Sequence, residues 1–143
     1  MGIGRGLNRE LFLYALDLEV KRARRSQYSF CALHLKLSKR PGKENGKGLQ
    51  SCHESLSNWL SGELREIDIL GFMADDELAV LLPYTDQAGG VRVRSRLEGR
   101  LKYLDIQTDD YAVMIDQISF PKDGPVAENS VYKVIATGKA IIV

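Results

Sequence analysis

Residues 67–83 read IDILGFMADDELAVLLP, and this stretch decides the fold class. Apolar residues or glycine occupy every second position from Ile67 to Met73, which is the period of a β-strand. A short polar sequence, Ala-Asp-Asp, follows at 74–76, and a second apolar run then continues to Pro83. Two such runs separated by a polar turn predict a β-hairpin.

Helical and strand patterns flank the hairpin on both sides. Apolar residues recur at helical spacing in three segments, which predicts helices near residues 7–25, 49–65 and 86–102. Period-two alternation predicts further strands over 28–37 and 111–120. A loop at 38–48 is expected between the strand 28–37 and the helix 49–65. We also expect a short helix over 127–137 and a last strand over 140–143. Strands and helices in this order are typical of an α/β fold (an α+β sandwich), with helices packed on a mostly antiparallel central sheet.

Composition and charge exclude several classes of protein. The 143 residues suit one domain, and 44% hydrophobic with 27% charged residues is typical of a folded soluble chain. Twenty basic and nineteen acidic residues leave a net charge of +1, which argues against binding to nucleic acid. No apolar run approaches the roughly 20 residues of a membrane span, so we expect a cytoplasmic protein without membrane insertion.

Cysteine and histidine are placed unfavourably for a metal site. Cys31 and His34 lie three residues apart on a predicted strand, so their side chains are expected on opposite faces. Cys52 and His53 are adjacent on a predicted helix and point about 100° apart. We therefore expect packing residues here, and no zinc.

Several short motifs follow one another along the chain, and their order and spacing are more informative than any one of them. They are Gly6–Arg9 before a long helix with a basic end, Arg65 and Asp68 as an Arg-x-x-Asp motif, Ala74–Leu78 after a five-residue spacer, an apolar strand ending at Pro83, and Ser119–Gly124. Their order and spacing resemble the GGDEF domain, the diguanylate cyclase module that makes or senses cyclic di-GMP. The resemblance spans nearly all of residues 4–125. We expect residues 1–143 to form one such domain, a module that usually sits within larger signalling chains.

The residues that the resemblance assigns to catalysis depart from the family pattern. Where active members carry an Asp-x-Asp pair for magnesium, this chain has Lys36 and Ser38. The signature turn is Ala74, Asp75, Asp76, Glu77 and Leu78, so an alanine and an aspartate replace the two glycines that let backbone amides approach phosphate. Because an ammonium group repels magnesium, we expect a degenerate cyclase site without a metal cofactor. We also expect Lys36 to form a salt bridge with Asp76.

The second site of the family, its inhibitory site, is retained. Arg65 and Asp68 match the Arg-x-x-Asp motif that binds cyclic di-GMP away from the catalytic centre. Arg96 falls where the family has a further arginine, and Arg92 lies one helical turn earlier on the same face. A guanidinium group donates paired hydrogen bonds to guanine or phosphate, and a carboxylate accepts from guanine N1 and N2. The resemblance therefore implies cyclic di-GMP binding by Arg65, Asp68, Arg92 and Arg96.

The sequence leaves three functions open. The first is a catalytically inactive domain that acts as a cyclic di-GMP receptor and docks another domain or a second copy of itself. The second is a protein-interaction or dimerisation domain that binds no nucleotide, in which Arg65 and Asp68 form only an ion pair at a helix end. The third is a residual enzyme that acts on GTP with Asp76 and Glu77. Titration with cyclic di-GMP separates the first from the second, and product formation from GTP tests the third.

Overall fold

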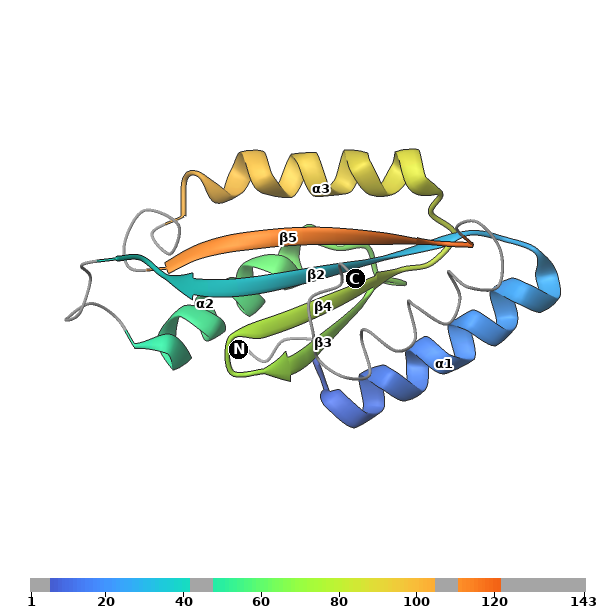
Figure 1. Ribbon diagram of the computed structural model, residues 1–143, viewed down its shortest axis with the longest axis horizontal. Helices are drawn as coiled ribbons and strands as arrows, with labels where there is room; N and C mark the ends of the chain where they lie inside the picture. The colour runs from blue at the N-terminus through green and yellow to red at the C-terminus, as the bar shows by residue number, and fades with distance from the viewer. Residues whose placement is uncertain (1–5, 42–47, 105–110, 122–143) are drawn as a thin grey trace.

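Five strands and three helices make up the part of the chain that the structure, a computed structural model, describes: residues 6–41, 48–104 and 111–121. Their order is β1 (Leu7–Asn8), α1 (Arg9–Ser26), β2 (Phe30–Lys39), α2 (Leu49–Glu63), β3 (Ile69–Ala74), β4 (Glu77–Leu82), α3 (Gln87–Leu101) and β5 (Tyr111–Phe120) (Figure 1). None of the described helices is both long enough and apolar enough to cross a membrane.

The strands form one sheet in the order β1-β3-β4-β2-β5. Strand β1 runs parallel to β3, and every other pair is antiparallel. The hairpin pairs Ile69 with Leu81 and Leu70 with Val80, so the stretch 67–83 forms the β3–β4 unit that its pattern predicted. Strand β2 lies between β4 and β5, which gives it a neighbour on both edges. The expected mostly antiparallel sheet is confirmed.

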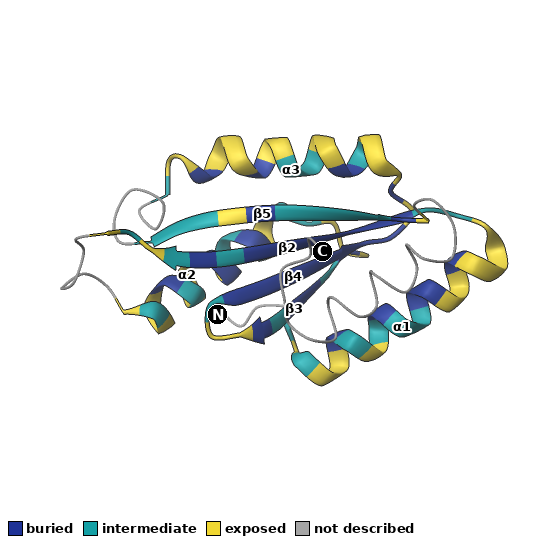
Figure 2. Ribbon diagram, in the orientation of Figure 1, coloured by how far each residue is buried: buried dark blue, intermediate teal, exposed yellow. Residues whose placement is uncertain are grey.

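Alternation along the strands divides the core into two layers. Leu33 and Leu35 of β2 face α2 and α3, whereas Phe30 and Ala32 of the same strand face α1. Helix α1 therefore covers one face of the sheet, and α2 with α3 cover the other (Figure 1). Figure 2 shows that β2 and β4 are buried along most of their length, while the outer side of α3 is exposed.

The predicted boundaries differ from the structure most at the start of the chain. Leu7 and Asn8 were expected in the first helix, but they form β1 and pair with Gly71 and Phe72 of β3. Helix α1 begins only at Arg9, because the Asn8 side chain accepts a hydrogen bond from the Leu11 amide and caps the helix. A two-residue strand has no periodicity of its own, so the helical pattern of its neighbours concealed it.

Other predicted boundaries are close to those observed. Strand β5 spans the predicted 111–120, and α3 spans 87–101 where 86–102 was predicted. Helix α2 ends at Glu63, two residues before the predicted end, and β2 runs two residues further than predicted. The helix expected over 127–137 and the strand over 140–143 lie outside the described residues.

Candidate ligand-binding site

Arg65 and Asp68 form a compact ion pair in the turn between α2 and β3. The guanidinium Nη2 of Arg65 lies 2.8 Å from Asp68 Oδ1, and Nε lies 3.1 Å from the same oxygen. The Arg65 backbone amide donates to Asp68 Oδ2 at 2.7 Å, and the Asp68 amide donates back to the Arg65 carbonyl at 3.0 Å. The Asp68 side chain is only 3% exposed, whereas that of Arg65 is 51% exposed. A buried carboxylate thus fixes the direction of an accessible guanidinium.

The same guanidinium also contacts the segment that leaves the hairpin. Arg65 Nη2 donates to the Pro83 carbonyl at 3.0 Å and to Thr85 Oγ1 at 3.1 Å. Thr85 is buried, and its hydroxyl donates to the Pro83 carbonyl at 3.0 Å. These bonds tie the chain just before β3 to the chain just after β4. The position of Arg65 is therefore set by residues that are distant in the sequence.

A pocket of about 760 Å³ opens beside Arg65. Its lining residues come from the α1–β2 connection, the α2–β3 turn, the β4–α3 connection and helix α3: Tyr28, Ser29, Arg65, Tyr84, Thr85, Asp86, Gly89, Arg92, Val93 and Arg96. The volume lies within the range of small-molecule sites. Three of the four residues predicted for ligand binding therefore line one pocket, and Asp68 lies beneath it without lining it.

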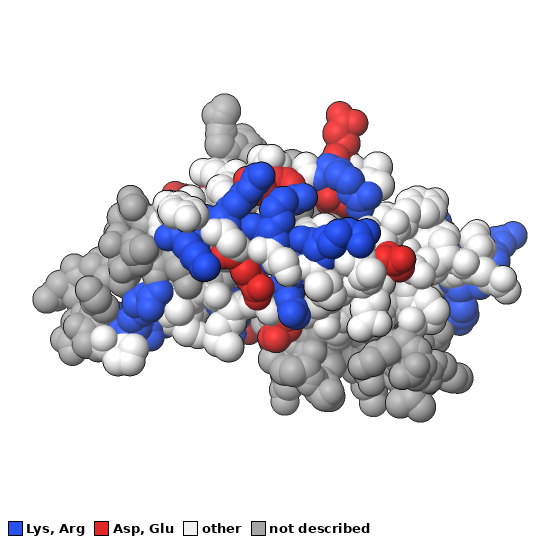
Figure 3. Space-filling model, turned by 90° about the horizontal axis from the view of Figure 1, so that it is seen from above, with Lys and Arg blue, Asp and Glu red and all other residues white. Residues whose placement is uncertain are grey.

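Positive charge dominates the pocket. Its one acidic lining residue, Asp86, is occupied as the cap of α3, where Oδ1 accepts from the Gly89 amide at 2.8 Å. Arg96 Nη2 donates to the Glu63 carbonyl at 3.0 Å, so this arginine is partly engaged. Arg92 has no hydrogen bond or ion pair with any residue that the structure describes. Figure 3 shows basic side chains gathered over α3. Of the three arginines that line the pocket, Arg92 is the one without a protein partner among the described residues.

Two tyrosines complete the pocket, and the sequence analysis missed both. The rings of Tyr28 and Tyr84 stack with centroids 4.3 Å apart and an interplanar angle of 29°. The Tyr28 hydroxyl donates to Glu19 Oε2 at 2.8 Å, and burial together with this bond raises the pKa of Tyr28 to about 12. No periodicity marks the two residues, because they stand in connections and meet only through the fold. A tyrosine directly after a strand-ending proline was the one available signal.

The residues of the signature turn lie at the tip of the β3–β4 hairpin. Ala74 ends β3, Glu77 begins β4, and Leu78 is buried in the core. Lys36 Nζ lies 3.4 Å from Asp76 Oδ2 and 3.3 Å from Glu77 Oε2, so the expected Lys36–Asp76 salt bridge is present. The hydrogen bond from Lys36 to Glu77, together with the charge of Asp76, raises the pKa of the Lys36 ammonium group.

Comparisons with known proteins identify the fold. No protein-family model matches the sequence, and a search of curated proteins gives no significant match. Solved structures do match. The GGDEF domain of FimX from Pseudomonas aeruginosa is 18% identical, with a TM-score of 0.68 over 87% of this chain and 81% of that one. The GGDEF domain of DgcB from Caulobacter crescentus, in complex with c-di-GMP, is 14% identical, with a TM-score of 0.62 over 95% and 86%.

The chain has the fold of a GGDEF domain. The diguanylate cyclase SiaD from Pseudomonas aeruginosa, in complex with its activator SiaC, matches as well, at 16% identity and a TM-score of 0.59 over 92% of this chain and 55% of that one. At identities this low, the structural similarity establishes the fold alone. The function of the site therefore depends on the residues that this chain carries.

Two carboxylates and an ammonium group lie together at the hairpin tip of this GGDEF fold. Magnesium requires oxygen ligands in a nearly octahedral arrangement. Here the Lys36 ammonium group lies against the carboxylates of Asp76 and Glu77, and His34 Nε2 lies 3.6 Å from Glu77 Oε1. Within the described residues, no group of three or more His, Cys, Asp and Glu side chains could hold a metal ion.

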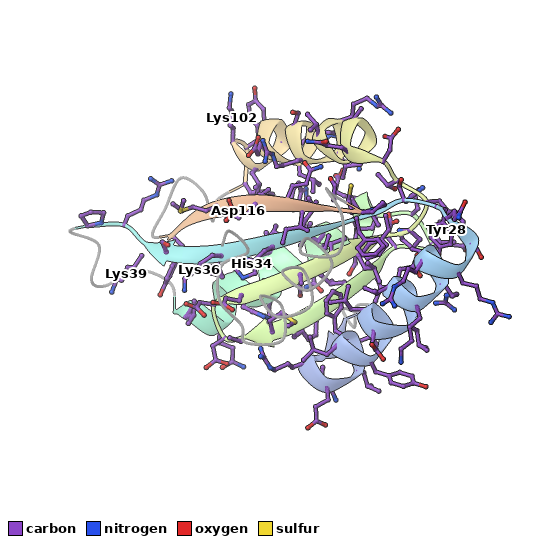
Figure 4. The ribbon with its side chains drawn as sticks, turned by 45° about the vertical axis from the view of Figure 1, so that its right-hand side comes forward. Tyr28, His34, Lys36, Lys39, Lys102 and Asp116 are labelled. Atoms are coloured by element: carbon purple, nitrogen blue, oxygen red, sulfur yellow. The ribbon has the colours of Figure 1, made fainter. Side chains whose placement is uncertain are left out.

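The pocket and the hairpin tip lie at opposite ends of the GGDEF sheet. Tyr28 stands beside the first residues of β2, whereas Lys36 and Lys39 lie towards its other end (Figure 4). Eight residues of extended chain separate Tyr28 from Lys36, which corresponds to roughly 25 Å. A ligand in the pocket would therefore not touch the signature turn.

Proposed function

We propose that this chain is a catalytically inactive GGDEF domain that binds cyclic di-GMP in the pocket lined by Arg65, Arg92 and Arg96. The observation that carries the proposal is the convergence of three guanidinium groups on one pocket of about 760 Å³. Cyclic di-GMP presents two phosphodiester groups and two guanine edges. Arginine matches both, since its planar fork donates paired hydrogen bonds to phosphate oxygens or to the O6 and N7 acceptors of guanine.

The arginines have different roles in this proposal. Arg92, without a partner among the described residues, supplies the cation that the ligand neutralises. Arg65 supplies a positive charge in a fixed position, because Asp68, Pro83 and Thr85 hold its guanidinium group in place. Both carboxylate oxygens of Asp68 accept hydrogen bonds from Arg65, and the Asp68 side chain is buried. We therefore assign Asp68 to positioning Arg65 and not to contacting guanine directly.

Catalytic inactivity is the second part of the proposal. The ion pairs of Lys36 with Asp76 and Glu77 support it, because the ammonium group neutralises the carboxylates that would have to bind metal. Incubation with GTP and magnesium, followed by chromatography, is expected to give no cyclic di-GMP. Product that forms with the wild type and disappears with Asp76→Asn would contradict this part.

Thermal denaturation with and without cyclic di-GMP tests the receptor function. A ligand at 100 times its Kd stabilises the folded state by about 2.7 kcal/mol, which raises Tm by several degrees in a domain of this size. We expect this shift in the wild type and its loss in Arg92→Ala and Arg65→Ala. Lys102→Ala is the matched control, because it removes one exposed positive charge beside α3 without touching the pocket. An equal shift in all four proteins would contradict the proposed site.

A protein-interaction function is the second candidate, and one surface feature favours it. Leu11 and Tyr14 of α1 are 52% and 63% exposed, and their spacing puts them on one side of the helix. SiaD, which has a similar fold, is in complex with its activator SiaC. A second copy of the chain is the simplest occupant. Sedimentation should then show a dimer that Leu11→Glu dissociates. A monomer at all concentrations would contradict self-association through α1.

A further inference from the structure

We infer that the exposed ring of Tyr84 is a stacking platform for a purine base and that the pocket selects phosphorylated purines over phosphate alone. This inference rests on the proposed function, because it adds a base-recognition element to the same arginine pocket. It concerns a residue outside the Arg-x-x-Asp motif, and it depends on the position of Tyr84 between the pocket and solvent.

The exposure of Tyr84 is the first observation. The residue is 68% exposed and lines the pocket together with all three arginines. Its ring rests on that of Tyr28, and a hydrogen bond to Glu19 holds the Tyr28 hydroxyl. An aromatic ring supported from below by a second ring presents a preformed flat surface. Such a surface can stack on any nucleotide base, since every base has a π-face.

The backbone of Tyr84 is the second observation. Its φ is 54°, in the left-handed region that non-glycine residues rarely adopt. Contacts on both sides hold this conformation: Arg65 donates to the Pro83 carbonyl, and the Thr85 amide donates to the Ser29 carbonyl at 3.1 Å. Strained conformations at ligand sites persist where the surroundings fix them. The backbone is thus fixed and the ring is stacked on Tyr28 before any ligand arrives, which lowers the entropic cost of base stacking.

The charges around the ring indicate which ligand fits. Arg92 and Arg96 come from α3 and Arg65 from the α2–β3 turn, so cations stand around an aromatic surface in one pocket. Phosphate alone would use the arginines and leave the tyrosine without a function. A base alone would leave the positive charge of Arg92 without a counterion. A molecule with both a purine and phosphate groups uses every part of the site.

Isothermal titration with three probes separates these contributions: cyclic di-GMP, GDP and inorganic pyrophosphate. The proteins are the wild type, Tyr84→Ala, Tyr84→Gly, Tyr84→Phe and Tyr103→Ala. Tyr84→Gly removes the ring while suiting the left-handed backbone, so it shows whether strain alone alters binding. Tyr103 is 86% exposed and does not line the pocket, which makes Tyr103→Ala the matched control.

We expect Tyr84→Ala and Tyr84→Gly to weaken cyclic di-GMP binding by about tenfold or more, as loss of base stacking does elsewhere. Tyr84→Phe and Tyr103→Ala should remain within about threefold of the wild type, because both keep the pocket ring. Pyrophosphate should bind the wild type more weakly than cyclic di-GMP does, and loss of the ring should not change its affinity.

Each other outcome decides against a different claim. If cyclic di-GMP binds the wild type and Tyr84→Ala equally well, the stacking role is wrong and the receptor function stands. If GDP binds in a Tyr84-dependent way and cyclic di-GMP does not bind, the stacking role stands and the proposed receptor is wrong. If neither purine ligand binds, both are wrong. Pyrophosphate binding as tight as that of either purine would overturn the selection for purines.

Discussion

Lys36 on β2 and Asp76 at the tip of the β3–β4 hairpin form an ion pair, with Nζ 3.4 Å from Oδ2. Glu77 Oε2 lies 3.3 Å from the same nitrogen. By its resemblance to GGDEF domains, this edge of the sheet is where a metal would be expected, and here an ammonium group lies against the carboxylates. The contribution of these ion pairs to the stability of the fold can be measured.

The Lys36–Glu77 pair should show a favourable coupling in a double-mutant cycle. Lys36→Met, Glu77→Gln and the double variant are compared by urea denaturation. Glu77 is mostly buried, but the Lys36 side chain is 43% exposed and screened by solvent. We therefore expect a coupling of only about 0.5–1.5 kcal/mol. A coupling indistinguishable from zero would mean that the ion pair does not contribute to stability.

Loss of the Asp68 charge should lower both stability and ligand affinity. Asp68→Asn replaces a buried carboxylate that accepts four hydrogen bonds from Arg65, so we expect a loss of about 2–3 kcal/mol in the free energy of unfolding. Cyclic di-GMP binding should also weaken, because the Arg65 fork loses its fixed direction. Glu66→Gln is the control, since that side chain belongs to an exposed residue of the same turn. Unchanged stability and affinity in Asp68→Asn would refute the positioning role.

Two glycines of α3 should respond in opposite ways to alanine. A Cβ on Gly90 would lie 2.6 Å from Cys31 Sγ and would also overlap the Gln117 amide, where α3 crosses β2 and β5. We expect Gly90→Ala to destabilise the fold by about 1–3 kcal/mol. Gly99 has nothing within 4 Å of such a Cβ, so Gly99→Ala should stabilise the helix by up to about 1 kcal/mol. Equal effects of the two substitutions, measured by thermal denaturation, would contradict the close contact of α3 with the sheet.

Alkaline pH should reveal the contribution of Tyr28. The pKa of Tyr28 is raised from 10.0 to about 12, first by burial and then by its bond to Glu19. As pH rises above about 10, the unfolded chain therefore loses this proton before the folded one does, and stability decreases until the pH passes about 12. Burial raises the pKa of Cys31 as well, so the wild type is compared with Tyr28→Phe. Urea midpoints from pH 8 to 11 should fall more steeply for the wild type, and parallel curves would contradict the effect of Tyr28.

Periodicity predicted the regular elements because they bury one face each. The hairpin, α3 and β5 show their burial in the sequence, and the structure places them within about two residues of the predicted ranges. Leu7 and Asn8 were misassigned, since a two-residue parallel strand is defined by its partner Gly71 and not by a pattern.

Only some residues of the candidate site could be predicted from the sequence. Arg65, Arg92 and Arg96 were found by spacing and resemblance, and the structure groups them around one pocket. The sequence did not predict Tyr28 and Tyr84 as pocket residues, because stacking between residues 56 positions apart depends on how β2 and β4 pair. The burial of Asp68 beneath Arg65 is likewise a property of the folded turn and has no counterpart in residue order.

Isothermal titration of the wild-type chain with cyclic di-GMP is the most direct test of the receptor function. The proposal predicts saturable binding with a micromolar or tighter Kd that weakens as salt increases, because arginine side chains neutralise the phosphodiester charges. Absence of heat at several temperatures, together with an unchanged Tm at saturating ligand, would contradict it. Arg65 and Asp68 would then be a structural ion pair in a GGDEF fold that serves protein interactions.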